Sequence, residues 1–314
     1  MVNNVPISVR HNLGGQMRLA KVSLIAILAL CICLPAKAQA KKQTIQYLGN
    51  FQRTGFYNVS NRIDSPAIEW KAEKSQYRAF KATVFNKELI TTGSWLSSFY
   101  IASGQKHWQS KVRYPFIEPA ALRNGIAYLS CNEGIVHAWD LKRDKAIWKK
   151  KVTEGQTAAP ALYKNLLLLP CYLHTVKAID INDPEVRWTF KLPDSPSAIS
   201  LWQDIGLTAL GENGVIAFDA TTGKKRWHIL QRQRCIAPPL VLSNKAVIAS
   251  VPVSLKKERI TTLTFIDIKT GKSAKTIKFP GVTIYPLAAD KQSIFIPTDD
   301  GLVVVPHKSA TPSD

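Results

Sequence analysis

Lys81 and Glu118 are the pair of residues whose types could carry out proton transfer. They stand 37 residues apart, at matching places in two similar segments of the chain. A lysine beside a carboxylate acts either as an acid/base couple or as a simple ion pair. The corresponding places in three later segments hold the apolar residues Ala159, Ile199 and Ala237, which a polar catalytic funnel would not contain. We therefore expect an ion pair between neighbouring segments.

Thiol chemistry is the second possibility. Cys131 and Cys171 are 40 residues apart, Cys235 is the third cysteine after residue 38, and His174 follows Cys171 closely. Equivalent places in two packed sheets lie about 10 Å apart, whereas a disulfide needs Cα atoms within about 7 Å. Two ligands do not close a metal site. We expect free, structural cysteines and no metal centre.

Basic residues in the predicted loops offer a third kind of chemistry, the binding of anions. The candidate binding face comprises Arg113, Arg232, Arg234, Lys256, Lys257 and Arg259. The last three lie in an insertion of about eight residues within 251–262, and insertions into one repeat often lie on a binding face. The opposite face is also basic, at Lys106, Lys142, Arg143, Lys145, Lys224 and Lys225. Two interpretations stay open, an anionic-ligand site and a solvated basic surface.

A regular period indicates what positions these residues. The tryptophans at 70, 108, 148, 188 and 227 are separated by 38, 40, 40 and 39 residues. Polar breaks at Asn86, Asn124, Asn165, Asp204, Asn244 and Asp290 keep nearly the same spacing. Asn and Asp suit tight turns because they tolerate left-handed backbone. A period of this size is typical of a repeat architecture.

Each repeat reads as four short strands. In the second repeat, Phe116–Leu122, Ile126–Ser130 and Ile135–Asp140 are apolar runs separated by turns, and Ala146–Trp148 begins a fourth. Turns every 8–12 residues indicate an all-β fold. The fold predicted is a β-propeller of about six four-stranded blades, in which stacking buries both faces of each sheet. An N-terminal strand at Pro66–Trp70 would close the ring, and seven blades are possible if Thr44–Phe56 contributes further strands.

A recurrent set of residues is predicted to dock one sheet on the next. In three repeats a small residue precedes an Asp by two positions, and a Trp follows that Asp by eight. The first repeat has Tyr100 in place of the Asp, and the fifth repeat has Lys275 in place of the Trp. The Asp would accept turn hydrogen bonds, and the Trp ring would lie between sheets. The docking set is Trp70, Trp108, Trp148, Trp188, Trp227, Ala138, Asp140, Ala178, Asp180, Ala217, Asp219 and Gly223.

The N-terminus reads as an export signal. Basic residues precede the apolar run Val22–Ala36, and small residues follow it, as in a cleaved secretory signal peptide. We expect residues 1–38 to be the signal peptide, 39–65 a lead-in segment, 66–306 the propeller and 307–314 a tail. The net charge of the whole chain is +20. Removal of residues 1–38 takes away four basic residues and no acid, which leaves +16 and favours anionic partners.

The sequence resembles the PQQ-like, quinoprotein-type β-propeller repeat family. The resemblance is carried by the pattern A-x-D-x-x-T-G-x-x-x-W at Ala217–Trp227 and by Asn50–Gly55, which looks like the segment opening such propellers. One kind of member is a quinone-dependent dehydrogenase with eight blades, adjacent cysteines, a calcium site and a catalytic Asp. This chain is too short, has no adjacent cysteines, and its acidic pair Asp299–Asp300 reads as a hairpin turn. The other kind is the non-catalytic propeller subunit of the outer-membrane β-barrel assembly machinery, an eight-bladed lipoprotein scaffold.

These features predict a non-catalytic scaffold or binding module in the periplasm, or secreted, after signal cleavage. Its expected partners are envelope proteins or an anionic envelope polymer, and we expect a monomer with no cofactor and no membrane span after cleavage. Nucleic acid is not an expected partner, because an export signal is present and no aromatic stacking stripe is found. The alternative is a small quinone (PQQ)-dependent oxidoreductase.

Overall fold

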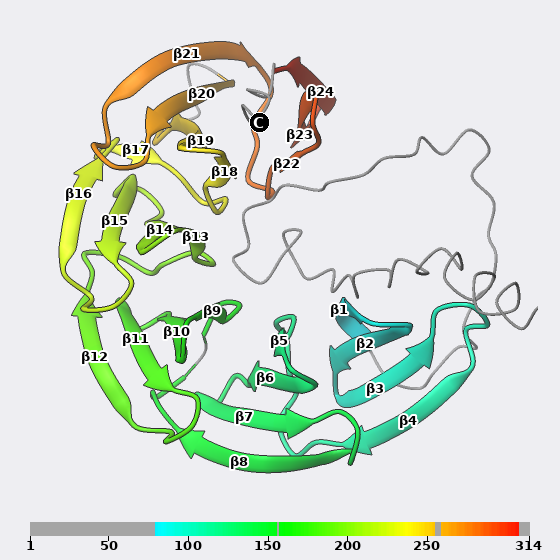
Figure 1. Ribbon diagram of the computed structural model, residues 1–314. Helices are drawn as coiled ribbons and strands as arrows, with labels where there is room; N and C mark the ends of the chain where they lie inside the picture. The colour runs from blue at the N-terminus through cyan, green and yellow to red at the C-terminus, as the bar shows by residue number, and fades with distance from the viewer. Residues whose placement is uncertain (1–78, 156, 255–258, 308–314) are drawn as a thin grey trace, which may run out of the picture. The chain divides into compact units, whose positions relative to one another are not determined.

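The computed structural model describes residues 79–155, 157–254 and 259–307, and these residues form 24 β-strands and no helix. The leader, the lead-in segment, Trp70, Lys256 and Lys257 lie outside the described residues, as does the predicted closing strand. The strands form antiparallel sheets that follow one another along the chain (Figure 1). The fold is an all-β propeller, as the period predicted.

The first three sheets contain four strands each, in sequence order. They are β1 (Ala79–Phe85), β2 (Glu88–Gly93), β3 (Trp95–Tyr100) and β4 (Lys106–Lys111); β5 (Ala121–Arg123), β6 (Ile126–Ser130), β7 (Ile135–Asp140) and β8 (Lys145–Lys151); and β9 (Ala161–Tyr163), β10 (Leu166–Cys171), β11 (Thr175–Asp180) and β12 (Val186–Lys191).

The other three sheets contain four, five and three strands within the described residues. They are β13 (Ser200–Trp202), β14 (Ile205–Ala209), β15 (Val215–Asp219) and β16 (Lys225–Ile229); β17 (Gln233–Arg234), β18 (Leu240–Leu242), β19 (Lys245–Pro252), β20 (Ile260–Asp267) and β21 (Ser273–Pro280); and β22 (Ala288–Ala289), β23 (Ser293–Thr298) and β24 (Gly301–Pro306).

The hydrophobic core is divided among the junctions between sheets. Each pair of consecutive sheets has its own buried cluster, such as Leu168 with Phe218 between the third and fourth sheets, and Leu207 with Ile248 between the fourth and fifth. A twisted four-stranded sheet has two apolar faces, and each is buried only by a neighbour. Packing at these junctions therefore stabilises the fold. It also determines which side chains of neighbouring sheets meet at the rim, the surface where the outer strands lie.

The sheet turns follow the Asp of each repeat. Asp140 Oδ1 accepts hydrogen bonds from the backbone N–H groups of Lys142 (2.9 Å) and Arg143 (3.0 Å), and Asp219 Oδ1 accepts those of Thr221 and Thr222. Asp180 accepts the N–H of Asn182, and this bond holds the pKa of Asp180 below its usual value. These carboxylates accept hydrogen bonds from the backbone N–H groups of the turn. They thereby fix where the fourth, outer strand of the sheet begins.

The tryptophan that follows each turn packs against the next sheet. Trp227 Nε1 donates to the carbonyl of Ile268 (2.8 Å), and Trp148 Nε1 donates to that of Ile181 (3.2 Å). At the junction of the third and fourth sheets, a Cβ on Gly223 would lie 2.6 Å from the ring of Trp188. Gly223 also has a φ of +73°, so glycine is required there for both the turn and the close approach.

The polar breaks form hairpins with two-residue loops. The prediction is wrong about which loop residue is left-handed in three of them. The first loop residue has positive φ in five of them, at Asn86, Asn124, Lys164, Gln203 and Ser243. The sequence singled out Asn165, Asp204 and Asn244, which are the second loop residues. The first loop residue takes the left-handed conformation whether it is Asn, Lys, Gln or Ser, so its position in the hairpin and not its type decides the conformation.

The fifth and last sheets depart from the repeat. The insertion lengthens β19 and β20, and β17 pairs with the added part of β19, so this sheet has five strands instead of the predicted four. The last sheet has three described strands, and its edge strand β24 leaves Leu302 and Val304 62% and 50% exposed. The predicted segment for the fourth position lies outside the described residues.

Candidate functional site

The surface has two grooves, and each is lined by a basic residue that the sequence predicted as a candidate for binding. Each groove lies where the end of one sheet's outer strand meets the outer strands of the next sheet. Arg113 lines one of them and Arg232 lines the other. The sequence placed both residues on one binding face, whereas the structure distributes them over two separate grooves.

The first groove, between the first and second sheets, has a volume of about 460 Å³. It is bounded by the end of β4 and the loop after it on one side, and by β7 and β8 on the other. Its lining residues are Lys111, Val112, Arg113, Tyr114, Ile135, His137, Trp139, Ala146, Lys149 and Lys151. They combine an apolar and aromatic floor with four basic side chains and no acid.

Three of the four cations of the first groove have no ion pair with any described residue. These are Lys111, Arg113 and Lys149, and all three are exposed. Arg113 places its guanidinium carbon 5.2 Å from the ring centroid of Tyr114. Lys151 pairs with Glu154 at 2.9 Å, and this hydrogen bond raises the pKa of Lys151. The groove therefore has an unbalanced positive charge.

His137 is a half-buried polar residue of the first groove. Its Nδ1 atom is buried and has no hydrogen-bond partner among the described residues, and its ring packs edge-on against Phe116 at 5.1 Å between centroids. Burial, and then the charge of Lys149, lower the pKa of His137. A second positive charge is costly at this place, so His137 is neutral at pH 7.

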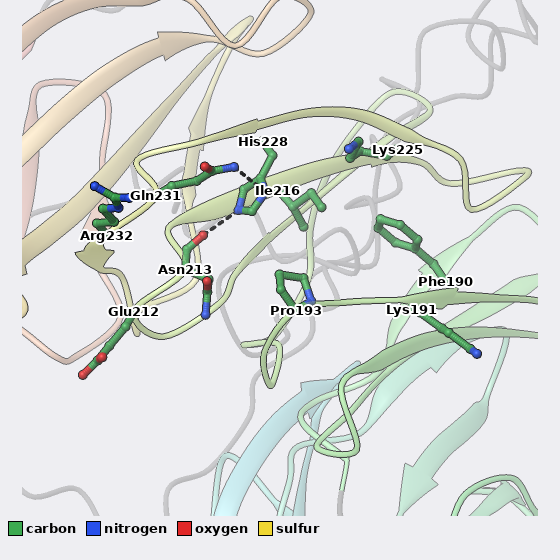
Figure 2. A pocket seen from close by; sticks show the side chains of 10 residues that line it. All are labelled: Phe190, Lys191, Pro193, Glu212, Asn213, Ile216, Lys225, His228, Gln231 and Arg232. Carbon is green, nitrogen blue, oxygen red and sulfur yellow. Dashed lines mark hydrogen bonds between the residues drawn. The ribbon is translucent and has the colours of Figure 1, made fainter.

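The second groove, between the third and fourth sheets, has a volume of about 560 Å³. Figure 2 shows the side chains that line it, which come from both sheets. They are Phe190, Lys191, Pro193, Glu212, Asn213, Ile216, Lys225, His228, Gln231 and Arg232. Lys191 and Lys225 are in this lining together with Glu212. The sequence placed Lys225 and Arg232 on opposite faces, whereas both line this groove.

The histidine of the second groove is fully hydrogen-bonded. His228 Nε2 lies 2.6 Å from the carbonyl oxygen of Asn213, and Gln231 Nε2 lies 3.0 Å from His228 Nδ1 (Figure 2). A carbonyl only accepts, so Nε2 carries the proton and Nδ1 accepts from the Gln231 amide. The Asn213 side chain in turn donates to Asp194 at 3.2 Å. This network holds the second groove in one arrangement.

The two grooves occupy equivalent positions in the repeat. Counting from the docking tryptophan of each sheet, Lys149 corresponds to His228, and Lys111 corresponds to Lys191. At the junction between the second and third sheets, Lys177 stands in the place of His137 and donates to the carbonyl of Val152 at 2.6 Å. A lysine thus bridges that junction, whereas the neutral His137 leaves the first groove open.

The other candidate residues lie apart from the grooves. Arg234 belongs to β17, and Arg259 forms an ion pair with Asp299. The predicted ion pair is confirmed, because Lys81 Nζ lies 2.8 Å from Glu118 Oε2. The cysteines at 131, 171 and 235 are free and buried, and burial raises the pKa of the Cys235 thiol to about 12. A thiol held protonated in this way is unreactive.

Sequence reasoning missed the aromatic and apolar part of the first groove, namely Tyr114, His137 and Trp139. A position-by-position comparison of the repeats contains a usable signal. In the second, third and fourth sheets, an Ala stands two residues before the turn Asp. The residue before this Ala is His137, Lys177 and Ile216, respectively. This position faces the junction and varies in polarity, which marks it as a place where the groove chemistry is set.

The described residues do not fit the quinone cofactor of the dehydrogenases in the wider repeat family. Ala159, Ile199 and Ala237 are buried and apolar, and Lys81 and Glu118 already bond each other. Within the described ranges, no group of three or more His, Cys, Asp or Glu side chains could hold a metal ion. Nor do these ranges contain a helix of the length and apolarity needed to cross a membrane.

The repeated sheets, the docking tryptophans and the rim grooves define a β-propeller of the PQQ-like repeat class. Residues 92–304 match the family described as outer membrane protein assembly factor BamB, and the chain belongs to that family. No curated protein matches its sequence.

Solved structures resemble the chain in fold. BamB from Moraxella catarrhalis has 12% identity and a TM-score of 0.48, covering 73% of this chain and 82% of the other. A computationally designed protein, Ika8, has 12% identity and a TM-score of 0.55, covering 76% and 86%. A chain of a mitotic checkpoint complex has 11% identity and a TM-score of 0.60, covering 75% and 76%. At such identities the likeness of the last two shows the fold alone.

Proposed function

We propose that this protein is an exported, non-catalytic propeller that serves as a scaffold for partner proteins in the cell envelope. The observation that carries the proposal is the family match over residues 92–304, because the description of that family is an assembly factor of the outer membrane. The apolar run after a basic N-terminal stretch supports export. Residues 1–38 would be removed, which leaves a basic chain facing the anionic surfaces of the envelope.

The grooves support a binding role in preference to a catalytic one. Both combine apolar side chains with exposed charges, as protein recognition surfaces do. The half-buried polar side chains of the second groove, His228 and Asn213, are held in a structural network. The Phe116 ring packs against His137 and the charge of Lys149 acts on it, and neither residue is a carboxylate that could orient the imidazole for catalysis. In nucleophilic catalysis the base typically contacts a nucleophile and is oriented by a third group.

Site-specific photocrosslinking in intact cells tests the scaffold role. A photoreactive amino acid would replace Arg113 in the first groove, Arg232 in the second, or Arg143, whose side chain is 72% exposed in the turn after β7. We expect discrete adducts with envelope proteins from at least one groove position, and weaker or no adducts from Arg143. The absence of protein adducts at both groove positions, with the protein present in the envelope fraction, would contradict the proposal.

The oxidoreductase alternative has its own test. The purified protein would be incubated with pyrroloquinoline quinone and calcium, and reduction of an artificial dye would be followed with alcohols and sugars as substrates. We expect no reduction above that of the free cofactor. Turnover that depends on the protein would replace the scaffold function with an enzymatic one.

A further inference from the structure

We propose that the first groove binds an acidic peptide segment of a partner protein, one that presents an aromatic or aliphatic side chain next to its carboxylates. The inference rests on the proposed scaffold function and specifies the chemistry of the partner. It concerns the junction between β4 and β8 alone. The second groove, at the equivalent junction, provides an internal comparison.

Charge complementarity is the first argument. Four basic residues and no acid line the groove, and Lys111, Arg113 and Lys149 have no ion pair within the described part of the chain. Three unpaired cations at one depression raise the local positive potential and attract carboxylates. The second groove differs because Glu212 lies in its lining. An anionic partner is therefore favoured at the first groove over the second.

The apolar floor is the second argument, and it selects a peptide over a polyanionic polymer. Val112, Tyr114, Ile135 and Trp139 contribute to the floor and are half-buried, so each retains exposed surface. Aromatic and aliphatic anchors entering such pockets supply most of the binding energy of peptide complexes. A chain of phosphates or acidic sugars would satisfy the cations but would leave the apolar surface without a partner. A volume of about 460 Å³ is in the range of small binding pockets.

The geometry of the cations is the third argument. Lys149 and Lys151 alternate along β8 and so extend from the same face of the sheet, with Lys111 and Arg113 on the strand end opposite. Side chains two apart in a strand are about 7 Å apart, which is also the spacing of alternate side chains in an extended peptide. An extended segment with acids at alternate positions therefore matches the row of lysines.

Binding of labelled peptides to the purified, exported protein tests the proposal. The probes would be a fluorescent peptide of alternating aspartate and phenylalanine, the same peptide with asparagine for aspartate, one with alanine for phenylalanine, and inorganic polyphosphate. We expect the acidic aromatic peptide to bind at about 150 mM salt, where weak surface electrostatics are largely screened. Each altered peptide should bind about tenfold more weakly, since it lacks one of the two recognised features.

Matched variants locate the site. Lys111→Glu and Lys149→Glu in the first groove should each weaken binding about tenfold, whereas Lys191→Glu, the equivalent of Lys111 in the second groove, should change it less than twofold. Lys111→Ala and Lys149→Ala provide milder changes if a reversal disturbs folding. The His137 ring protons give an independent readout, because a carboxylate bound beside Lys149 would shift their NMR resonances.

Each other outcome contradicts the inference. Equal losses from Lys111→Glu and Lys191→Glu would mean that binding follows net charge alone. Tighter binding of polyphosphate than of the peptide would assign the groove to an anionic polymer. Equal binding of the phenylalanine and alanine peptides would show that the apolar floor of the groove does not contribute to binding. Because crosslinking at Arg232 is measured separately, the scaffold function can stand when this peptide site fails.

Discussion

The first and second grooves lie at equivalent junctions of the same repeat, yet they differ in two respects. The first contains four basic residues and no acid, and the Nδ1 of His137 has no partner among the described residues. The second includes Glu212, and both ring nitrogens of His228 are hydrogen-bonded. The backbone of the repeat is conserved between the two junctions while the chemistry at the rim changes. Packing of the sheets and specialisation of the grooves are thus separable, and substitutions at matched positions test that separation.

Removal of the docking tryptophans should have the largest effect, and it should be similar at both junctions. Trp108→Ala and Trp188→Ala should each lower the free energy of unfolding by about 3–5 kcal/mol, because each deletes a large ring packed in a junction core. Urea denaturation measures the change. Neither indole nitrogen has a partner in the described residues, so Phe should restore more stability at 188 than at 227. A cost near zero at either position would show that the two junctions are not equivalent.

The turn residue before the outer strand should separate the junctions. Gly223→Ala should cost about 2–4 kcal/mol, since the added Cβ would lie 2.6 Å from Trp188 and φ is +73°. The corresponding residue of the second sheet is Asp144, with φ of +49° and hydrogen bonds to Ser110 and Trp139. Asp144→Gly relieves the backbone while losing those bonds, so its net cost should be within about 1 kcal/mol. Thermal unfolding of both variants gives the comparison, and equal costs would contradict it.

The smallest expected effect is a pH dependence confined to the first groove. Burial and Lys149 lower the pKa of His137 below its ordinary value of 6.5. The unfolded chain then binds this proton more tightly than the folded one, so stability falls as the pH drops below about 6.5 and down through the folded pKa. His137→Phe should flatten the dependence of unfolding free energy between about pH 7.5 and 5, whereas His228→Gln controls for other groups. The carboxylates with lowered pKa, such as Asp180, lose their contribution only in more acidic solution.

The arrangement of strands could be read largely from the sequence. The predicted bounds of β6 and β7, Ile126–Ser130 and Ile135–Asp140, are those observed. The first strand of that sheet was predicted as Phe116–Leu122 and is shorter, Ala121–Arg123. Pro119 lacks the N–H that a ladder needs, so regular pairing begins after it. Local apolar runs and turn residues contain this information because each strand and hairpin is formed within about ten residues.

The candidate site was predicted only in part. Charge in the loops identified Arg113 and Arg232, but not that they belong to different grooves. Arg259, in the insertion, forms an ion pair with Asp299. Nothing in the sequence near either residue predicts this ion pair. Grooves form where side chains from two sheets, about 25 to 40 residues apart, fail to fill the space between them. Such a mismatch cannot be inferred from one segment alone.

The sequence by itself determined the repeat and the β class, and it singled out the recurring tryptophans and turn aspartates, because these depend on periodicity and on short-range hydrogen bonds. The tertiary structure decided which positions at each junction are bridged, as by Lys177, and which stay open, as beside His137. The physical reason is that an open groove depends on the length and charge of side chains contributed by two neighbouring sheets at once. Their packing against each other is fixed only when the chain has folded.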